Sequence, residues 1–271
     1  MSVPSLKSGC RMTGVVVRLF RYPVKGLSPE RMGALTLTHA HGIERDRSFA
    51  LALGTTEFDP AQPRPLAKTN FLMLAKNEAL ARLQTGLDQD RRLTVRLDGL
   101  TVAEGRLDDA AGRGAIEDFF TAFVGDAARG RVRVVSAPGH RFTDIGAPVP
   151  EFMDCVSLIN LASLRALETL MARRLDPLRF RANIYVDGLP AWAEFDRLGA
   201  SLIVGQAECR VVRRTRRCPA TNVDPVTARR DADVPRALRD AFGHADLGVY
   251  LQPVGAGTVT SGDAVSMSQA V

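Results

Sequence analysis

The 271 residues are enough for one large domain or two modest ones with a hydrophobic core. Hydrophobic residues make up 45% of the chain and charged residues 24%, the balance of an ordinary globular protein. No stretch approaches the roughly 20 apolar residues of a membrane helix, and the first residues lack the apolar segment of a secretion signal. We therefore expect a soluble, cytoplasmic protein with no membrane association.

The basic residues that give the chain its net charge of +6 are almost all arginine. With 4 lysines among 36 basic residues, 32 are arginine, whose planar group suits phosphate better than the point charge of lysine. The densest basic cluster, residues 213–217, leads directly into a cysteine. Aromatic residues are only 6%, fewer than a protein that stacks on nucleic-acid bases would need, so we expect no nucleic-acid partner.

The first half of the chain reads mainly as short strands. We predict strands over residues 15–20, 35–38 and 48–53, and a short helix over 77–83. Residues 93–97 alternate in polarity, Asp98-Gly99 supplies a tight turn, and 100–103 return as the second strand of a hairpin. Ile116, Phe120 and Phe123 share one face of a predicted helix that stops at Gly125.

The second half repeats this β-rich pattern. We predict strands at 156–159, 183–186, 201–204, 207–215, 249–254 and 258–265, and a helix at 233–242. A further amphipathic helix begins near Leu164 and is closed off before Pro177. The predicted fold class is mainly β with a few helices (α+β), built of barrels or sandwiches. Gly and Pro concentrate around 126–150, where we place a boundary between two modules, residues 13–128 and 129–268.

Cys218 is the most informative single position. The four cysteines, at 10, 155, 209 and 218, include no C-x-x-C pair, which argues against an iron–sulfur cluster or structural zinc. Four arginines lie within the five residues before Cys218, and positive charge favours thiolate over thiol. That thiolate could attack an electrophile or bind a soft metal, and a buried structural thiol is the alternative. We expect Cys155 and Cys209 to be core residues, and Cys10 to lie in a leader segment.

Other polar residues are less decisive by themselves. Lys25 follows a strand, where a lysine is usually solvated, and Asp46-Arg47 forms a local ion pair of little expected value. Arg181 and Asn183 flank an apolar strand, where a phosphate would be a suitable partner. The pair His39 and His41 lacks a third ligand, and the signatures of serine hydrolases, P-loop proteins and dinucleotide-binding proteins are absent from the sequence.

Several motifs, taken in chain order, resemble those of the MOSC family. The N-terminal ones resemble the β-barrel module that accompanies MOSC domains, and the later ones resemble the MOSC domain itself, with matches from about residue 15 to 265. In one-letter code they are YPVK at 22–25, GIERDR at 42–47, NLASL at 160–164, FRANI at 180–184, RCPATNVDP at 217–225 and SGD at 261–263.

The resemblance implies a molybdenum-cofactor protein with an N-terminal β-barrel-like module packed on a MOSC β-barrel, similar to the mitochondrial amidoxime-reducing component. It implies that Cys218 ligates molybdenum as the catalytic residue. It also implies cofactor-binding roles for a set of polar residues, namely Lys25, Arg47, Ser163, Arg181, Asn183, Arg217 and Thr221. The implied reaction is reduction of an N-hydroxylated or N-oxide small molecule, with electrons from a separate donor protein, and no pyridoxal phosphate or iron–sulfur cluster in this chain.

Two departures from the family's pattern and one alternative function accompany this prediction. Gly26 stands where relatives often carry a serine, and residues 226–229 lack the glycine that is common there. The alternative is a carrier of cofactor or sulfur, in which Cys218 bears a persulfide.

Overall fold

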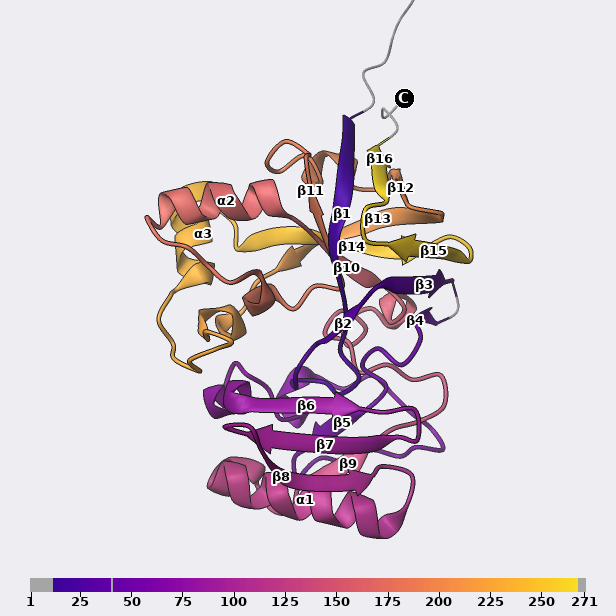
Figure 1. The fold of residues 1–271 in the computed structure, drawn as a ribbon, viewed down its shortest axis with the longest axis vertical. Coiled ribbons are helices and arrows are strands. Elements are labelled where there is room, and N and C mark those ends of the chain that lie inside the picture. The colour runs from indigo at the N-terminus through magenta and orange to yellow at the C-terminus, as the bar shows by residue number, and fades with distance from the viewer. Residues whose placement is uncertain (1–11, 40, 268–271) are drawn as a thin grey trace, which may run out of the picture.

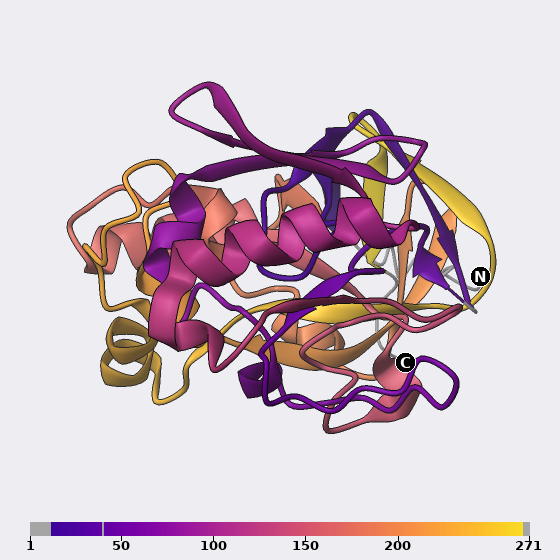
Figure 2. The same cartoon turned by 90° about the horizontal axis from the view of Figure 1, so that it is seen from below.

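The computed structural model describes residues 12–39 and 41–267 and shows a mostly β molecule with three α-helices in that part of the chain (Figure 1). The prediction of a mainly β fold with few helices is therefore confirmed. In Figure 1 a barrel flanked by two helices forms the upper part, and small sheets with one helix form the lower part, which Figure 2 shows from below. Cys10 lies outside the described residues.

Seven strands close into a barrel in the upper part of the molecule. Around the ring they are β1 (Met12–Arg21), β11 (Ile184–Asp187), β10 (Val156–Asn160), β14 (Asp246–Pro253), β13 (Ala207–Arg216), β12 (Ser201–Val204) and β16 (Ala264–Met267). β1 pairs with both β11 and β16 and so closes the ring. β2 (Glu30–Met32) extends the sheet from β1. Because β1 comes from the N-terminal module, the barrel is built from both ends of the chain.

Alternating burial along the barrel strands explains why the sequence folds in this way. In β13 the side chains of Ala207, Cys209 and Val211 are buried in the barrel core, and Glu208 and Arg210 between them are exposed. Successive side chains of a strand point to opposite faces, so this pattern commits one face to the interior. Cys209 is thus a core residue, as predicted.

The remaining strands form three small sheets. These are β6 (Leu83–Leu87) with β7 (Arg92–Leu97) and β8 (Leu100–Arg106), β5 (Ala50–Ala52) with β9 (Arg133–Val135), and β15 (Gly257–Thr260) with β3 (Ala34–Thr38) and β4 (Gly42–Ile43). The hairpin at Asp98-Gly99 is confirmed, with both turn residues at positive φ (52° and 83°). β15 pairs with β3, so strand pairing also links the last part of the chain to the first.

The three α-helices begin and end at recognisable residues. α1 (Ala110–Val124) begins after Asp109, whose carboxylate accepts the backbone N–H of Gly112, and ends at Gly125 as predicted. α2 (Leu161–Leu170) and α3 (Val234–Phe242) cover one side of the barrel. Short 3₁₀ helices occupy several connections, namely η1 (Lys68–Asn70), η2 (Glu78–Arg82), η3 (Gly125–Ala128), η4 (Pro150–Phe152), η5 (Pro177–Phe180), η6 (Phe195–Arg197) and η7 (Pro219–Asn222).

Three predicted elements differ from the observed ones. The helix expected at 77–83 is the 3₁₀ turn η2, and β6 begins immediately after it at Leu83. The helix expected to reach Pro177 ends at Leu170, and Ala172 then takes a left-handed conformation with φ 50°. The single strand expected at 258–265 is two strands, β15 and β16, because a turn at residues 261–263 separates them.

Candidate functional site

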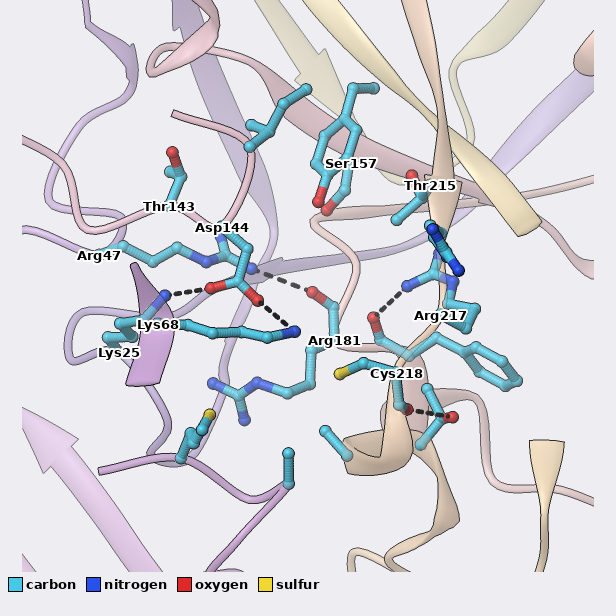
Figure 3. Close-up of a pocket in the computed structure, with 18 of the residues that line it drawn as sticks. Lys25, Arg47, Lys68, Thr143, Asp144, Ser157, Arg181, Thr215, Arg217 and Cys218 are labelled. Atoms are coloured by element: carbon cyan, nitrogen blue, oxygen red, sulfur yellow. Dashed lines mark hydrogen bonds and ion pairs between the residues drawn. The ribbon is translucent and has the colours of Figure 1, made fainter. Parts of the chain in front are cut away.

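A cavity of about 420 Å³ lies where the barrel meets the N-terminal sheets, and its lining is strongly basic (Figure 3). Nine lining residues carry a basic side chain, namely Lys25, Arg47, Lys68, Arg179, Arg181, Arg213, Arg214, Arg216 and Arg217. Among the described residues that line it, only Asp144 is acidic. Low-dielectric walls that carry one sign of charge concentrate the field inside a cleft. The cavity is therefore suited to an anionic ligand.

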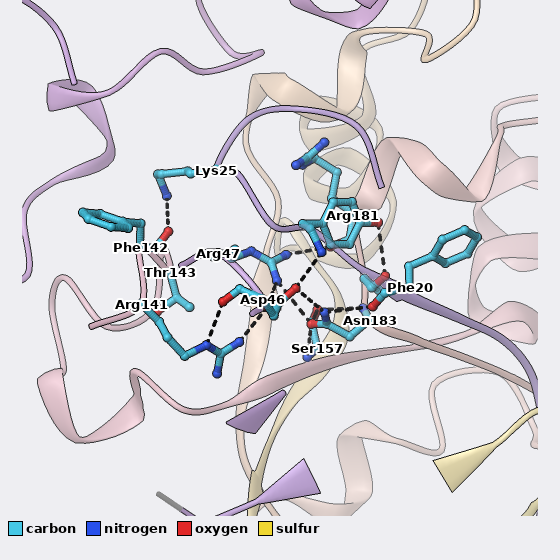
Figure 4. Close-up of polar contacts among 12 residues, drawn as sticks. Phe20, Lys25, Asp46, Arg47, Arg141, Phe142, Thr143, Ser157, Arg181 and Asn183 are labelled. Atoms are coloured by element: carbon cyan, nitrogen blue, oxygen red, sulfur yellow. Dashed lines mark hydrogen bonds and ion pairs between the residues drawn. The ribbon is translucent and has the colours of Figure 1, made fainter. Parts of the chain in front are cut away.

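One wall of the cavity is organised by Asp46, whose side chain is completely buried (Figure 4). Its carboxylate accepts the backbone N–H of Tyr22 at 2.8 Å, the amide of Asn183 at 3.1 Å and the guanidinium of Arg141 at 2.6 Å. It also pairs with Arg47. Burial by itself would raise the pKa of Asp46, but the charges of Arg47 and Arg141 outweigh it, so the pKa is lowered and the group stays ionised.

The ring of Tyr22 is a platform for two arginines. The guanidinium carbons of Arg47 and Arg181 lie 4.8 and 4.5 Å from its centroid, within the range of a cation–π interaction. Arg47 also donates to the backbone carbonyl of Arg181 at 3.1 Å. Burial raises the pKa of Tyr22 to about 12, so the phenol is neutral. The platform brings two positive groups together although they are 134 residues apart in the sequence.

Arg181 differs from Arg47 in having no acidic partner. Within the described residues its guanidinium makes no ion pair and no hydrogen bond, and its contact is the Tyr22 ring. Burial lowers its pKa, and the like charge of Arg47 acts in the same direction. Arg181 is partly buried, and a cation withdrawn from water in this way is costly unless a counter-charge is nearby. Arg181 therefore indicates where an anion would be most stabilising.

Lys25 is buried, contrary to the usual solvated position of such a lysine. Its ammonium donates to the backbone carbonyl of Phe142 at 2.9 Å and pairs with Asp144. The second oxygen of Asp144 lies 3.9 Å from the ammonium of Lys68. Lys25 comes from the loop after β1, and Asp144 lies between β9 and β10, so the two halves of the sequence meet in this ion pair (Figure 3).

Cys218 stands on the other side of the cavity, just after β13, and its side chain is partly exposed. Its backbone carbonyl accepts both the N–H of Thr221 at 3.0 Å and the hydroxyl of Thr221 at 2.9 Å. In Figure 3 the sulfur points toward the side of the cavity that holds Arg181 and Lys68. Within the described residues no hydrogen bond reaches this sulfur, which leaves it available to a ligand.

Two family models match the chain. The MOSC N-terminal beta barrel domain matches residues 13–129, and the MOSC domain matches residues 150–266. The chain is a MOSC-domain protein. The resemblance found in its motifs is therefore confirmed at the level of the family.

Solved structures of other proteins are similar to parts or all of this chain. The YUAD protein from Bacillus subtilis has 15% sequence identity, covers 96% of this chain and 98% of its own, and has a TM-score of 0.44. YiiM from Geobacillus stearothermophilus has 20% identity, covers 43% of this chain and 55% of its own, and has a TM-score of 0.34. YiiM from Escherichia coli has 16% identity over the same shares, with a TM-score of 0.32. A comparison with curated proteins found no match.

Most of the residues that the MOSC resemblance selected lie at this cavity. Lys25, Arg47, Arg181, Asn183, Arg217, Cys218 and Thr221 all line it. Ser163 does not, because its hydroxyl donates to the buried carboxylate of Glu194 at 2.8 Å behind α2. The cofactor-binding roles of these residues remain predictions. Asn183, Arg217 and Thr221 also make hydrogen bonds that hold neighbouring parts of the cavity wall in place.

Asn183 and Arg217 support other residues through their side chains. The Asn183 amide donates to the carbonyl of Phe20 at 3.2 Å and to Asp46, which uses its two N–H groups. The Arg217 guanidinium donates to the carbonyls of Leu247, at 2.7 Å, and Phe180, at 3.0 Å, and so fixes the chain just before Cys218. Thr221 fixes the chain just after it. These residues hold the MOSC site in shape.

The two departures from the family pattern have conformational consequences. Gly26 has φ +84°, and a Cβ there would lie 2.8 Å from the carbonyl oxygen of Leu72, so glycine suits this position better than serine. Ala228 has φ 57°, a left-handed conformation that a glycine would adopt without strain.

Three further residues at the site were not predicted from the sequence: Lys68, Asp144 and Arg141. Lys68 had a usable signal, because lysine is rare here and two of the four lysines line the cavity. Asp144 falls in the stretch that we interpreted as a boundary between modules. Arg141 had no local signal, since it reaches Asp46 across 95 residues of sequence.

Cys155 was predicted to be core and is 3% exposed, yet it also lines the cavity. Burial raises its pKa to about 12, so it is a neutral thiol. Among the described residues, no group of three or more His, Cys, Asp or Glu side chains could hold a metal. His39 and His41 are therefore not part of such a group. In the same part of the chain no helix is both long and apolar enough to cross a membrane.

Proposed function

We propose that this MOSC-domain protein binds a molybdenum–pterin cofactor in the cavity, with Cys218 as sulfur ligand, and reduces N-hydroxylated or N-oxide compounds. The observation that carries the proposal is that the Cys218 sulfur, which has no hydrogen-bond partner in the described part of the chain, faces the same cavity as the basic wall of Lys25, Arg47 and Arg181. A thiolate suits a soft metal, and the basic wall suits the terminal phosphate of a pterin.

The residues present fit such a cofactor in size and charge. A volume of about 420 Å³ lies within the range of about 300–1,000 Å³ of small-molecule sites. Arg181 makes no ion pair with any of the described residues, so a phosphate would give it a direct anionic partner. Arg47 sits beside Arg181 on the Tyr22 ring, so a phosphate could accept hydrogen bonds from two planar groups at once.

The bound cofactor would supply the oxygen-transfer and two-electron chemistry, with electrons from a separate donor protein. The chain's own part is to hold, orient and shield. Arg217 and Thr221 fix the backbone on both sides of Cys218, so the thiolate is presented in one direction. Asp46 keeps Arg47 oriented and charged. Reduction of an N-hydroxylated or N-oxide compound consumes two electrons and two protons and releases the amine-level product and one water.

The test replaces Cys218 and compares it with a second cysteine of the same cavity. Protein from a molybdenum-replete host should contain molybdenum and pterin and should reduce a hydroxylamine with a chemical electron donor. Cys218→Ala should abolish turnover with the fold intact, whereas Cys155→Ala should retain turnover. Full activity of Cys218→Ala would refute the mechanism. Cofactor that dissociates readily, together with no reduction by the wild-type protein, would favour a cofactor or sulfur carrier.

A further inference from the structure

We propose that Asp144 is an internal competitor for the anion site. Its carboxylate occupies Lys25 and Lys68 until an anionic ligand displaces it, and Asp144 thereby sets how tightly a phosphate group binds. This inference rests on the anion-binding part of the proposed function and is independent of the metal and of the reaction.

The contacts of Asp144 are those that a phosphate would make. One carboxylate oxygen pairs with the ammonium of Lys25, and the other lies 3.9 Å from the ammonium of Lys68. The ammonium of Lys25 also donates to the carbonyl of Phe142 at 2.9 Å and lies 5.9 Å from the centroid of the Phe71 ring. Figure 3 shows the carboxylate between the two lysines, on the side of the cavity next to Arg47 and Arg181. A phosphate that reaches Lys25 must therefore share it with Asp144 or replace it.

Asp144 is held much less firmly than Asp46, the other acidic group at this wall. The Asp46 side chain is 0% exposed and is fixed by two guanidinium groups, a backbone N–H and an amide. The Asp144 side chain is 46% exposed, and its ion-pair partners among the described residues are the two lysines. Its carboxylate can therefore be rehydrated when it leaves. Lys25 is only 9% exposed, so it needs a replacement counter-charge, which an incoming anion supplies.

Charge makes joint occupancy unfavourable. Desolvation alone would raise the pKa of Asp144, but the charges of Lys25, Lys68 and Arg47 lower it to about 2, so the carboxylate is ionised at neutral pH. A phosphate beside it would place two negative groups within a few ångströms of each other. Without a ligand, however, Asp144 supplies the counter-charge that partly offsets the lowering of the Lys25 pKa by burial. The same residue thus stabilises the empty site and opposes binding.

The experiment measures binding of inorganic phosphate by titration calorimetry at pH 7.5, with full-length protein from a host that makes no pterin cofactor. Asp144→Asn should bind phosphate about tenfold more tightly than wild type, which corresponds to about 1.4 kcal/mol. Asp144→Ser should change affinity in the same direction. The matched control is Asp118→Asn, which changes the net charge equally but alters a side chain that is 71% exposed on α1. It should change affinity less than twofold.

An unchanged or weaker phosphate affinity of Asp144→Asn would overturn the inference, because Asp144 would then position Lys25 for binding. Absence of phosphate binding in both wild type and Asp144→Asn would overturn it as well. If the Asp144 effect is present but purified protein contains no molybdenum, the proposed function fails and the competitor role of Asp144 stands.

Discussion

The two sides of the cavity are built in different ways. Arg47, on the basic side, is held by its own side-chain contacts, with Asp46 as ion-pair partner and the Tyr22 ring as support. Cys218, on the other side, is held through its backbone, and its sulfur has no hydrogen-bond partner among the described residues. The basic side is thus preorganised for charge, whereas the sulfur side offers a fixed but unused ligand atom.

This difference shows which side determines stability and which determines chemistry. Removing one partner of a buried charge network leaves other charges uncompensated and is costly. Replacing the Cys218 side chain leaves no hydrogen-bonding group without its partner in the described part of the chain, because the sulfur accepts and donates no hydrogen bond there. We therefore expect substitutions on the basic side to affect folding as well as binding, and substitutions of Cys218 to affect chemistry alone.

The largest effect is expected for Asp46→Ala. It leaves Arg47 and Arg141 buried without their shared carboxylate and removes acceptors from Tyr22 and Asn183. By analogy with other broken buried ion pairs, the free energy of unfolding should fall by about 3–5 kcal/mol. Urea unfolding followed by fluorescence would measure it. A loss below about 1 kcal/mol would mean that the Asp46 network does not hold the basic side together.

The pH dependence of stability gives the internal check on that variant. The pKa of Asp46 is lowered in the folded protein, so its contribution is present above its ordinary pKa of 3.8 and is lost as pH falls through the folded value. The stability difference between wild type and Asp46→Ala should therefore shrink below about pH 4. A difference that stays constant to lower pH would contradict the assignment of the ion pair as its source.

A smaller effect should separate two arginines of the same cavity. Arg181 has no acidic partner, whereas Arg179 pairs with Asp224 at 2.6 Å and Asp231 at 2.8 Å. Arg181→Gln should weaken phosphate binding by about ten- to hundredfold, as expected for charged hydrogen bonds of about 1.5–3 kcal/mol, with little change in unfolding free energy. Arg179→Gln should lower the free energy of unfolding and change phosphate affinity little, because Asp224 and Asp231 lose the buried arginine that they share, although Asp231 keeps its pair with Arg173. Calorimetry and urea unfolding on both variants would show whether the two roles are separate.

The fold was predictable where local patterns decide it. The turn at Asp98-Gly99 and the helix end at Gly125 follow from residues that favour these conformations, and both are observed. β6 was not predicted, because the glycine in Leu83–Leu87 weakens the local signal and the strand is formed by pairing with β7. Likewise, nothing in the residues after Leu170 marks the end of α2 before Pro177.

Those residues of the cavity that belong to the MOSC motifs could be predicted from the sequence. Cys218 stood out from its arginine neighbours alone, while Lys25 and Arg181 depended on the MOSC resemblance. Asp144 was beyond local reasoning, because its partner Lys25 lies 119 residues away. Ser163 shows the converse, since a motif residue turns to Glu194 instead of the cavity. Sequence patterns indicate which residue types matter, but only folding determines which of them meet.

The most direct test of the central claim is X-ray absorption at the molybdenum edge, on the purified wild type and on Cys218→Ser. We predict that the wild-type metal has one protein sulfur ligand in addition to the pterin sulfurs, and that the variant has one sulfur fewer. Identical sulfur coordination in the two proteins would contradict the account, because Cys218 would then not be a ligand of the metal.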